Sequence, residues 1–137
     1  MPTPPLPPTL EQFLEKPNPA VIASLRPDGQ PHTAATWYLW RDGRVLVNMD
    51  ESRKRLDYLR KDPRVSITVL GHDSWYRQVT LSGRVTSLEP DPQLEGIDSL
   101  SRHYMGEPYS GRDQARVDAW IEVESWHAWD GGGPWQV

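Results

Sequence analysis

The chain of 137 residues contains no cysteine, a single phenylalanine and no long apolar run. Without cysteine there is no disulfide framework, no thiolate nucleophile and no cysteine-ligated metal. No stretch is apolar enough to cross a bilayer or to serve as the hydrophobic region of a signal peptide, so we expect a soluble, cytoplasmic protein with no membrane partner. The histidines lie far apart, without the spacing of metal ligands, so we expect no metal and surface or hydrogen-bonded roles for His32, His72, His103 and His127.

An excess of positive charge is also missing. Fifteen lysines and arginines stand against 19 aspartates and glutamates, a net charge of −4 with neutral histidine. Nucleic-acid binding needs a basic face that displaces counterions, so no nucleic-acid partner is expected. The sequence also has no P-loop, no G-x-G-x-x-G pattern and no G-x-S-x-G nucleophile elbow, and no side chain stands out as catalytic.

Aromatic residues and prolines are plentiful. Seven tryptophans and five tyrosines supply large buried areas, so one compact domain is feasible despite a hydrophobic content of 36%. Prolines crowd residues 1–8, which predicts a disordered tail. The "GGGP" stretch predicts a second flexible tail over residues 131–137 and leaves residues 9–130 as the domain.

The patterning between these tails predicts a mainly β protein. Alternating apolar residues and short glycine-containing turns predict strands over residues 20–25, 32–40 and 44–49, joined as a meander, and further strands over 64–71, 75–89 (bent at Gly83) and 115–131. Short helices are predicted over 10–16, capped by Thr9, over 52–61, capped by Ser52, and over 91–106. About six antiparallel strands with short helices between them are typical of a small barrel.

The stretch "DESRKRLDYLRKDPR" places cations where a helix disfavours them. Arg53, Lys54 and Arg55 would fill the first helical turn, whose free N–H groups already carry partial positive charge. That placement becomes favourable when an anion such as a phosphate, or the carboxylate of an acidic protein partner, sits between them. A solvated charged face is the alternative, and it suits the cations at the other end of the helix.

The strand over residues 44–49 ends where this basic helix begins. A ligand with its phosphate on the helix start can therefore lay its body along that strand. Backbone groups there can contact the polar edge of a flat ring, and Trp37 on the neighbouring strand can cover a face of it. Trp75 and Arg77 begin the long strand near the mouth of the barrel, where Trp75 is either a core residue or faces a cofactor. Tyr104 and Tyr109 flank "MGEP" and either pack structurally or close over the site.

In this order, "AVIASLRPDGQPHTAATWYLW", "SRKRLDYLRKDPRVSITV" and "RQVTLSGRV" resemble the pyridoxamine-phosphate-oxidase-like split β-barrel flavoproteins. The resemblance covers residues 13–129 and implies a homodimer with two cofactor sites at the subunit interface. It implies that Arg53 and Lys54 hold the cofactor phosphate, with Arg55 joining them as in deazaflavin-using relatives. It also implies that Gln78 reaches the cofactor of the partner subunit. The residues placed along the ring system are Val47, Asn48 and Met49, with Thr36 and Trp37 on the neighbouring strand.

The end of the chain departs from the true oxidase, whose closing motif grips the substrate phosphate with an arginine. "WHAWDGGGPWQV" has neither arginine nor lysine, which argues against pyridoxamine phosphate as the substrate. The chain is more similar to a short actinobacterial branch that uses coenzyme F-420. The resemblance thus implies an oxidoreductase that transfers hydride between F-420 and a conjugated small molecule such as an enone or quinone. The alternatives are an FMN-dependent oxidase-like enzyme and a non-catalytic carrier of flavin, deazaflavin or haem.

Overall fold

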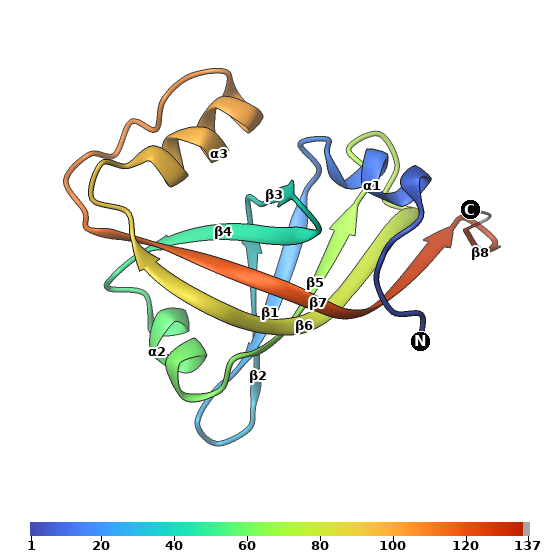
Figure 1. Cartoon of the computed structure of the whole chain (residues 1–137), viewed down its shortest axis with the longest axis horizontal. Helices are drawn as coiled ribbons and strands as arrows, with labels where there is room; N and C mark the ends of the chain where they lie inside the picture. The colour runs from blue at the N-terminus through green and yellow to red at the C-terminus, as the bar shows by residue number, and fades with distance from the viewer. Residues whose placement is uncertain (136–137) are drawn as a thin grey trace.

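The computed structural model describes residues 1–135, which form three short helices and one antiparallel sheet of eight strands (Figure 1). The sheet order is β2-β1-β5-β6-β7-β4-β3, with β8 paired to β7. The elements in chain order are α1 (Pro8–Leu14), β1 (Ala20–Leu25), β2 (Pro31–Thr36), β3 (Leu39–Arg41), β4 (Arg44–Asp50), α2 (Lys54–Lys61), β5 (Arg64–Leu70), β6 (Arg77–Pro90), α3 (Glu95–Met105), β7 (Arg116–Asp130) and β8 (Gly133–Pro134). The predicted mainly β, antiparallel class is confirmed.

Alternation along the central strands builds the core. In β5, Val65, Ile67 and Val69 are buried, whereas Ser66 and Thr68 on the opposite face are partly exposed. The apolar face follows from the two-residue period of a strand, because successive side chains point to opposite sides of the sheet. Each such side chain, fully buried, stabilises the fold by roughly 1.5–3 kcal/mol. The buried face of β5 could therefore be predicted from the sequence.

The predicted three-strand meander over residues 20–49 is wrong. Residues 32–40 are not one strand: β2 ends at Thr36 and β3 begins at Leu39. β2 pairs with β1, whereas β3 pairs with β4 at the other end of the sheet order. The break lies at Trp37 and Tyr38, where the N–H of Tyr38 donates to the hydroxyl of Tyr104 at 3.3 Å instead of joining a strand ladder.

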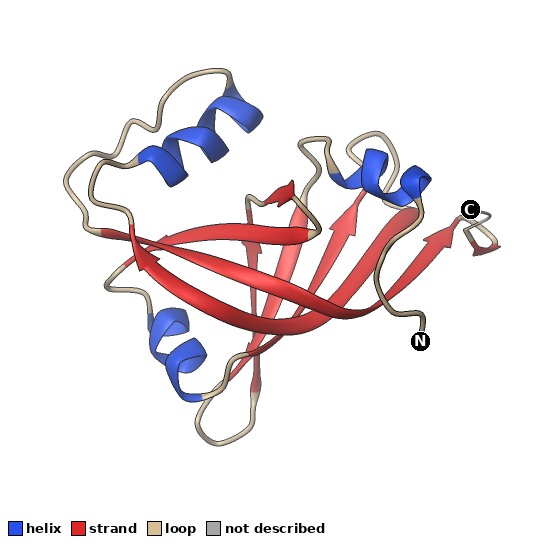
Figure 2. Ribbon diagram, viewed as in Figure 1, coloured by secondary structure: helices blue, strands red, loops and turns tan. Residues whose placement is uncertain are grey.

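This division explains how the sheet curves. Its two outer strands are consecutive in the chain and only two residues apart, so both ends of the sheet order meet near Trp37 and Tyr38. The sheet therefore wraps toward closure without a ladder of hydrogen bonds between β2 and β3. The long strands β6 and β7 run across this wrapped sheet, with the helices outside it (Figure 2).

Gly83 marks an irregularity in β6, as the sequence predicts. The pairing of β6 with β7 shifts register between Ser82 and Gly83 and again between Val85 and Ser87. A Cβ at Gly83 would overlap the backbone carbonyl of Glu122. The strands approach so closely there that only glycine fits, which is the usual reason for glycine at a strand bulge.

The helix starts differ from the predicted caps. α1 begins at Pro8, so Thr9 lies inside it and caps nothing. α2 begins at Lys54 after Arg53, and the hydroxyl of Ser52 donates to the carboxylate of Asp50 instead of capping the helix. α3 begins four residues later than predicted, after Leu94 in a left-handed conformation (φ 59°).

Parts of residues 1–8 and 131–135 contact the rest of the domain, and the disorder of the two tails stays a prediction. Leu6 is buried in the core, and the carbonyl of Pro2 accepts from the N–H of Trp126 at 3.0 Å. At the other end, Trp135 packs edge to face on Phe13 with ring centroids 5.0 Å apart. Apolar residues in both segments supply this contact; residues 136 and 137 lie outside the described part of the chain.

Two further findings concern residues 1–135. The three helices are all too short and too polar to span a bilayer. No group of three or more histidines and carboxylates in this part of the chain is arranged to hold a metal ion.

Candidate functional site

A cleft of about 1390 Å³ opens between the start of α2, the strands β2 and β4, and α3. Ligand pockets are commonly about 300–1,000 Å³, so this cleft has room for a molecule of cofactor size. It is lined by basic residues at the α2 end and by aromatic residues at the α3 end. Its lining includes Pro17, Pro19, His32, Thr36, Trp37, Met49, Asp50, Arg53, Lys54, Arg55, His72, Ile97, Leu100, Tyr104, Tyr109 and Arg116.

The basic end of the cleft carries more cations than carboxylates. Arg53, Lys54 and Arg55 all line it, as predicted for an anion site. Asp50 neutralises part of this charge, with its Oδ2 3.2 Å from Nε of Arg53. Hydrogen bonds from Ser52 are the largest cause holding the pKa of Asp50 below its usual value, so this carboxylate is ionised at neutral pH. Within residues 1–135, Lys54 and Arg55 have no carboxylate within 4.0 Å.

Arg55 is the most informative of the three cations. It is half-buried, and its Nε is closed to solvent with no hydrogen-bond partner in the described residues. Burial, and then the nearby charge of Arg53, lower the pKa of its guanidinium. A partly buried cation without a counter-ion costs stability. An anion in the cleft would offset that cost, so the residues present fit a phosphorylated ligand.

Part of the edge of β4 beside the cleft has no strand partner in residues 1–135. β3 pairs with β4 only as far as Leu46, and beyond it β4 has a strand partner only on the β7 side. The backbone groups of this stretch that point away from β7 are therefore left for another contact, apart from the carbonyl of Asp50, which accepts from the N–H of Arg53 at 3.2 Å. The side chain of Val47 is fully buried in the core, so only its backbone can meet a ligand, whereas Met49 lines the cleft.

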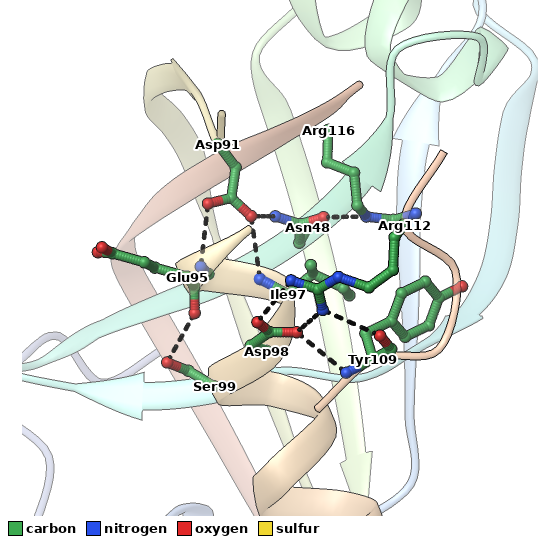
Figure 3. A network of polar contacts seen from close by, with 10 residues as sticks. Asn48, Asp91, Glu95, Ile97, Asp98, Ser99, Tyr109, Arg112 and Arg116 are labelled. Atoms are coloured by element: carbon green, nitrogen blue, oxygen red, sulfur yellow. Dashed lines mark hydrogen bonds and ion pairs between the residues drawn. The ribbon is translucent and has the colours of Figure 1, made fainter. Parts of the chain in front are cut away.

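The side chain of Asn48 is committed to a buried polar network (Figure 3). Its Nδ2 donates to Asp91 at 3.1 Å and to Asp118 at 2.7 Å, and its Oδ1 accepts from Nε of Arg116 at 2.7 Å. Asp91 in turn accepts from the first N–H groups of α3. The side-chain amide of Asn48 therefore has few hydrogen-bonding groups left for the ligand contact that was predicted for it. Its amide instead connects α3 to β4 through Asp91.

Aromatic side chains close the other end of the cleft. Trp37 lies in the link between β2 and β3, not on a strand beside β4 as predicted, and its ring stacks on Tyr104 at 5.4 Å between centroids. Tyr109 meets Trp37 at a right angle, 6.1 Å away. Since Tyr104 occupies one face of Trp37, only the other face or an edge is left for a ring. Thr36, at the end of β2, lines the cleft next to it.

The segment that carries Tyr109 is clamped to α3. Arg112 donates from Nη1 to Asp98 at 2.7 Å and to the carbonyl of Tyr109 at 3.0 Å, while the N–H of Tyr109 donates to Asp98 at 3.0 Å (Figure 3). Arg116 also lies 4.9 Å from the ring of Tyr109. These contacts hold Tyr109 in the wall of the cleft.

Four predicted site residues do not line the cleft of this chain: Val47, Trp75, Arg77 and Gln78. Trp75 is 69% exposed, and Gln78 pairs in the sheet with Leu70 and Trp129. Arg77 forms an ion pair with Asp130 at 3.3 Å. Trp75, Arg77 and Gln78 lie at or just before the start of β6, which pairs with the end of β7 that also carries β8. α2 lies on the other side of the molecule from β8 (Figure 1).

The lining residues that the sequence did not predict include His32, His72 and Arg116. The two-residue period gave a signal for His32, because it shares a face of β2 with Thr36. His72 lies in the loop between β5 and β6, and Arg116 is the first residue of β7, so only the folded chain brings them to the cleft.

Asp118 offers a test of the network through pH. Burial, followed by the charges of Asp91 and Glu89, raises its pKa above 3.8, against the opposing hydrogen bond from Asn48. A raised pKa means that the folded state binds the proton more tightly, so ionised Asp118 opposes folding as pH rises through that pKa. We expect Asp118→Asn, which keeps an acceptor for Asn48, to raise the Tm at pH 7. The gain should vanish below pH 3.8 in thermal melts, and an equal gain at both pH values would contradict the charge argument.

Solved structures with the same fold include an F420 reductase, to which this chain is 26% identical with a TM-score of 0.79, over 88% of this chain and 98% of the other. A conserved hypothetical protein from Mycobacterium tuberculosis is 25% identical with a TM-score of 0.75, over 93% and 86%. General Stress Protein 26 from Bacillus anthracis shares the fold at 20% identity, with a TM-score of 0.66 over 89% and 95%.

The family model for pyridoxamine 5'-phosphate oxidase matches residues 6–130, nearly the whole described chain and all of the cleft. The fold of this family binds flavins, and its members include oxidoreductases. By this match the chain belongs to the pyridoxamine 5'-phosphate oxidase family.

Proposed function

We propose that this protein is an oxidoreductase that binds coenzyme F-420 in the cleft and reduces a conjugated small molecule such as an enone or quinone. The observation that carries the proposal is the basic end of the cleft, where Arg55 has no counter-ion in the described residues. The similarity to an F420 reductase favours a deazaflavin over FMN. FMN is the second candidate, because its phosphate would suit the same cations.

In this proposal the protein binds and orients the cofactor. Arg53, Lys54 and Arg55 hold the phosphate, and the free edge of β4 contacts the polar side of the ring. When bound, the deazaflavin supplies the hydride. Trp37 and the residues of α3 shield the ring end from water, which strengthens the electrostatic interactions inside the cleft.

We also propose a homodimer in which Gln78, Trp75 and Arg77 meet the cleft of the partner subunit. They do not line the cleft of their own chain. The exposed aromatic rings beside them support an interface, since Trp75 is 69% and Tyr76 62% exposed. Light scattering of the purified protein is expected to give twice the mass of one chain, 15.7 kDa. A monomer under cofactor-saturating conditions would contradict the shared site.

Titration of the purified protein with F-420 and with FMN tests the function. Absorbance and fluorescence are expected to show saturable binding, tighter for F-420. The reduced cofactor should then be oxidised when an enone such as cyclohex-2-enone or a quinone such as menadione is added. Binding without consumption of the reduced cofactor would indicate the carrier instead, and no binding of either cofactor would overturn the proposal.

A further inference from the structure

We propose that His72 is the proton donor of this site, an inference that rests on the proposed function. Reduction of an activated C=C bond needs a proton as well as a hydride. His72 lies in the wall of the cleft with Pro17 and Pro19 and was expected to have only a surface or structural role. The contacts around it fix which of its ring nitrogens carries a proton.

The loop that holds His72 is closed by backbone hydrogen bonds. The N–H of Gly71 donates to the carbonyl of Arg77 at 2.8 Å, and the N–H of Arg77 donates to the carbonyl of Ser74 at 3.1 Å. A Cβ on Gly71 would lie 2.7 Å from the carbonyl oxygen of Ser74, so the turn is tight. His72 therefore projects from a constrained turn between β5 and β6.

Asn18 orients the imidazole of His72. This asparagine is fully buried, and its Nδ2 donates to the carbonyl of Phe13 at 2.7 Å and to the hydroxyl of Tyr38 at 3.2 Å. A backbone carbonyl only accepts, so the amide group of Asn18 must point its nitrogen at Phe13. Its Oδ1 then faces His72, where it accepts from the backbone N–H at 3.2 Å and lies 3.3 Å from Nδ1.

The amide oxygen cannot donate, so Nδ1 of His72 must carry the hydrogen of that contact. The imidazole is held as the Nδ1–H tautomer, and a second proton can bind only at Nε2. Nε2 lies across the ring from Asn18 and has no hydrogen-bond partner in residues 1–135. The ring is thus anchored on one side and free to exchange a proton on the other.

The place of His72 in the cleft suits this role. Asn18, which holds it, also accepts at its carbonyl from the hydroxyl of Tyr104 at 2.7 Å, and Tyr104 stacks on Trp37. His72 therefore belongs to the aromatic end. His32 lies near the basic end, because its ring is 5.6 Å from that of Tyr58 in α2. Along β2 the distance from His32 to Thr36 is about 13 Å at the usual rise per residue. A ligand with its phosphate at one end can place its ring at the other.

The neighbouring tyrosines are poor proton donors by comparison. The hydroxyl of Tyr104 already donates to Asn18, and burial raises its pKa to about 12. The hydroxyl of Tyr38 is fully buried and donates to the carbonyl of Lys16 at 3.3 Å. His72 is exposed and can regain a proton from solvent.

The step balances in atoms and charge. The reduced deazaflavin, as the anion that lacks one ring N–H proton, would supply a hydride to one carbon of the activated C=C, and the electron pair of that π bond would move to the other carbon or its conjugated oxygen. Nε2–H of protonated His72 breaks as the proton is given to that position. The products are the reduced substrate, the oxidised cofactor and neutral His72, which takes a proton from water.

Nitrogen NMR of the protein without cofactor tests the orientation directly. For neutral His72 we expect the Nδ1–H tautomer, whereas histidine free in water favours Nε2–H. His127, which is exposed and outside the cleft, serves as the control within the same spectrum. An Nε2–H tautomer at His72 would overturn the proposed proton path whatever the activity.

Kinetics test the chemical role. We expect His72→Gln to lower kcat with F-420 and cyclohex-2-enone by about 10²–10⁴-fold, with an unchanged dissociation constant for F-420. His127→Gln should leave both values unchanged, and added imidazole should partly restore kcat in His72→Ala. Full turnover in His72→Gln would overturn the acid role alone. Absence of turnover in the wild type would overturn the proposed function and this inference together.

Discussion

Replacing Arg53, Lys54 and Arg55 together by alanine is expected to weaken the binding of F-420 and FMN by about 100-fold or more. Hydrogen bonds to charged groups contribute about 1.5–3 kcal/mol each, and 1.4 kcal/mol is a factor of ten. The loss should depend on the phosphate. Riboflavin, which is FMN without its phosphate, should bind wild type and variant equally in fluorescence titrations.

The chain supplies a matched control for this variant. Arg60, Lys61 and Arg64 lie at or just beyond the other end of α2, and none of them lines the cleft. Their triple alanine variant removes the same charge, so it should lose little affinity if the position of the cations matters. Equal losses of affinity in both triple variants would show a general charge effect. Undiminished FMN binding in the Arg53, Lys54 and Arg55 variant would contradict the proposal that these residues bind the phosphate.

Asp91→Ala is expected to lower the free energy of unfolding by about 3 kcal/mol, because it leaves buried donors without a partner. The carboxylate is 5% exposed and accepts from the N–H groups of Gly96 and Ile97 at 3.0 and 3.1 Å, and from Asn48. It thus satisfies the first turn of α3 and sits at the favourable end of its dipole. Urea titration measures the loss, and amide exchange in α3 should speed up with it.

Two variants make this result interpretable. Asp91→Asn keeps an acceptor but loses the charge, so its loss should be intermediate. Asp113→Ala removes an exposed carboxylate that follows α3 and forms no ion pair in the described residues, and it should leave stability unchanged. If Asp91→Ala is as stable as Asp113→Ala, the hydrogen-bond network of Figure 3 does not hold α3 in place beside the cleft.

Local sequence patterns predicted most of the strands and the basic end of the cleft. The apolar period of β5 and the cations of residues 53–55 are local properties, so a single sequence reveals them. The bend at Gly83 was predicted for the same reason, and the fold explains it through the carbonyl of Glu122.

Long-range pairing could not be predicted in this way. Residues 32–40 have a continuous strand pattern, yet their two halves pair at opposite ends of the sheet order. The helix cap at Ser52 failed because Asp50 competes for its hydroxyl and its N–H. The orientation of His72 depends on Asn18, 54 residues earlier in the chain, and no local pattern joins the two.

The most direct test is a crystal structure of the protein grown with F-420. We expect the phosphate against Arg53, Lys54 and Arg55, with the ring between the free edge of β4 and Trp37. A cofactor bound elsewhere, or a basic end of the cleft that stays open to solvent while the cofactor is present, would contradict the proposed site.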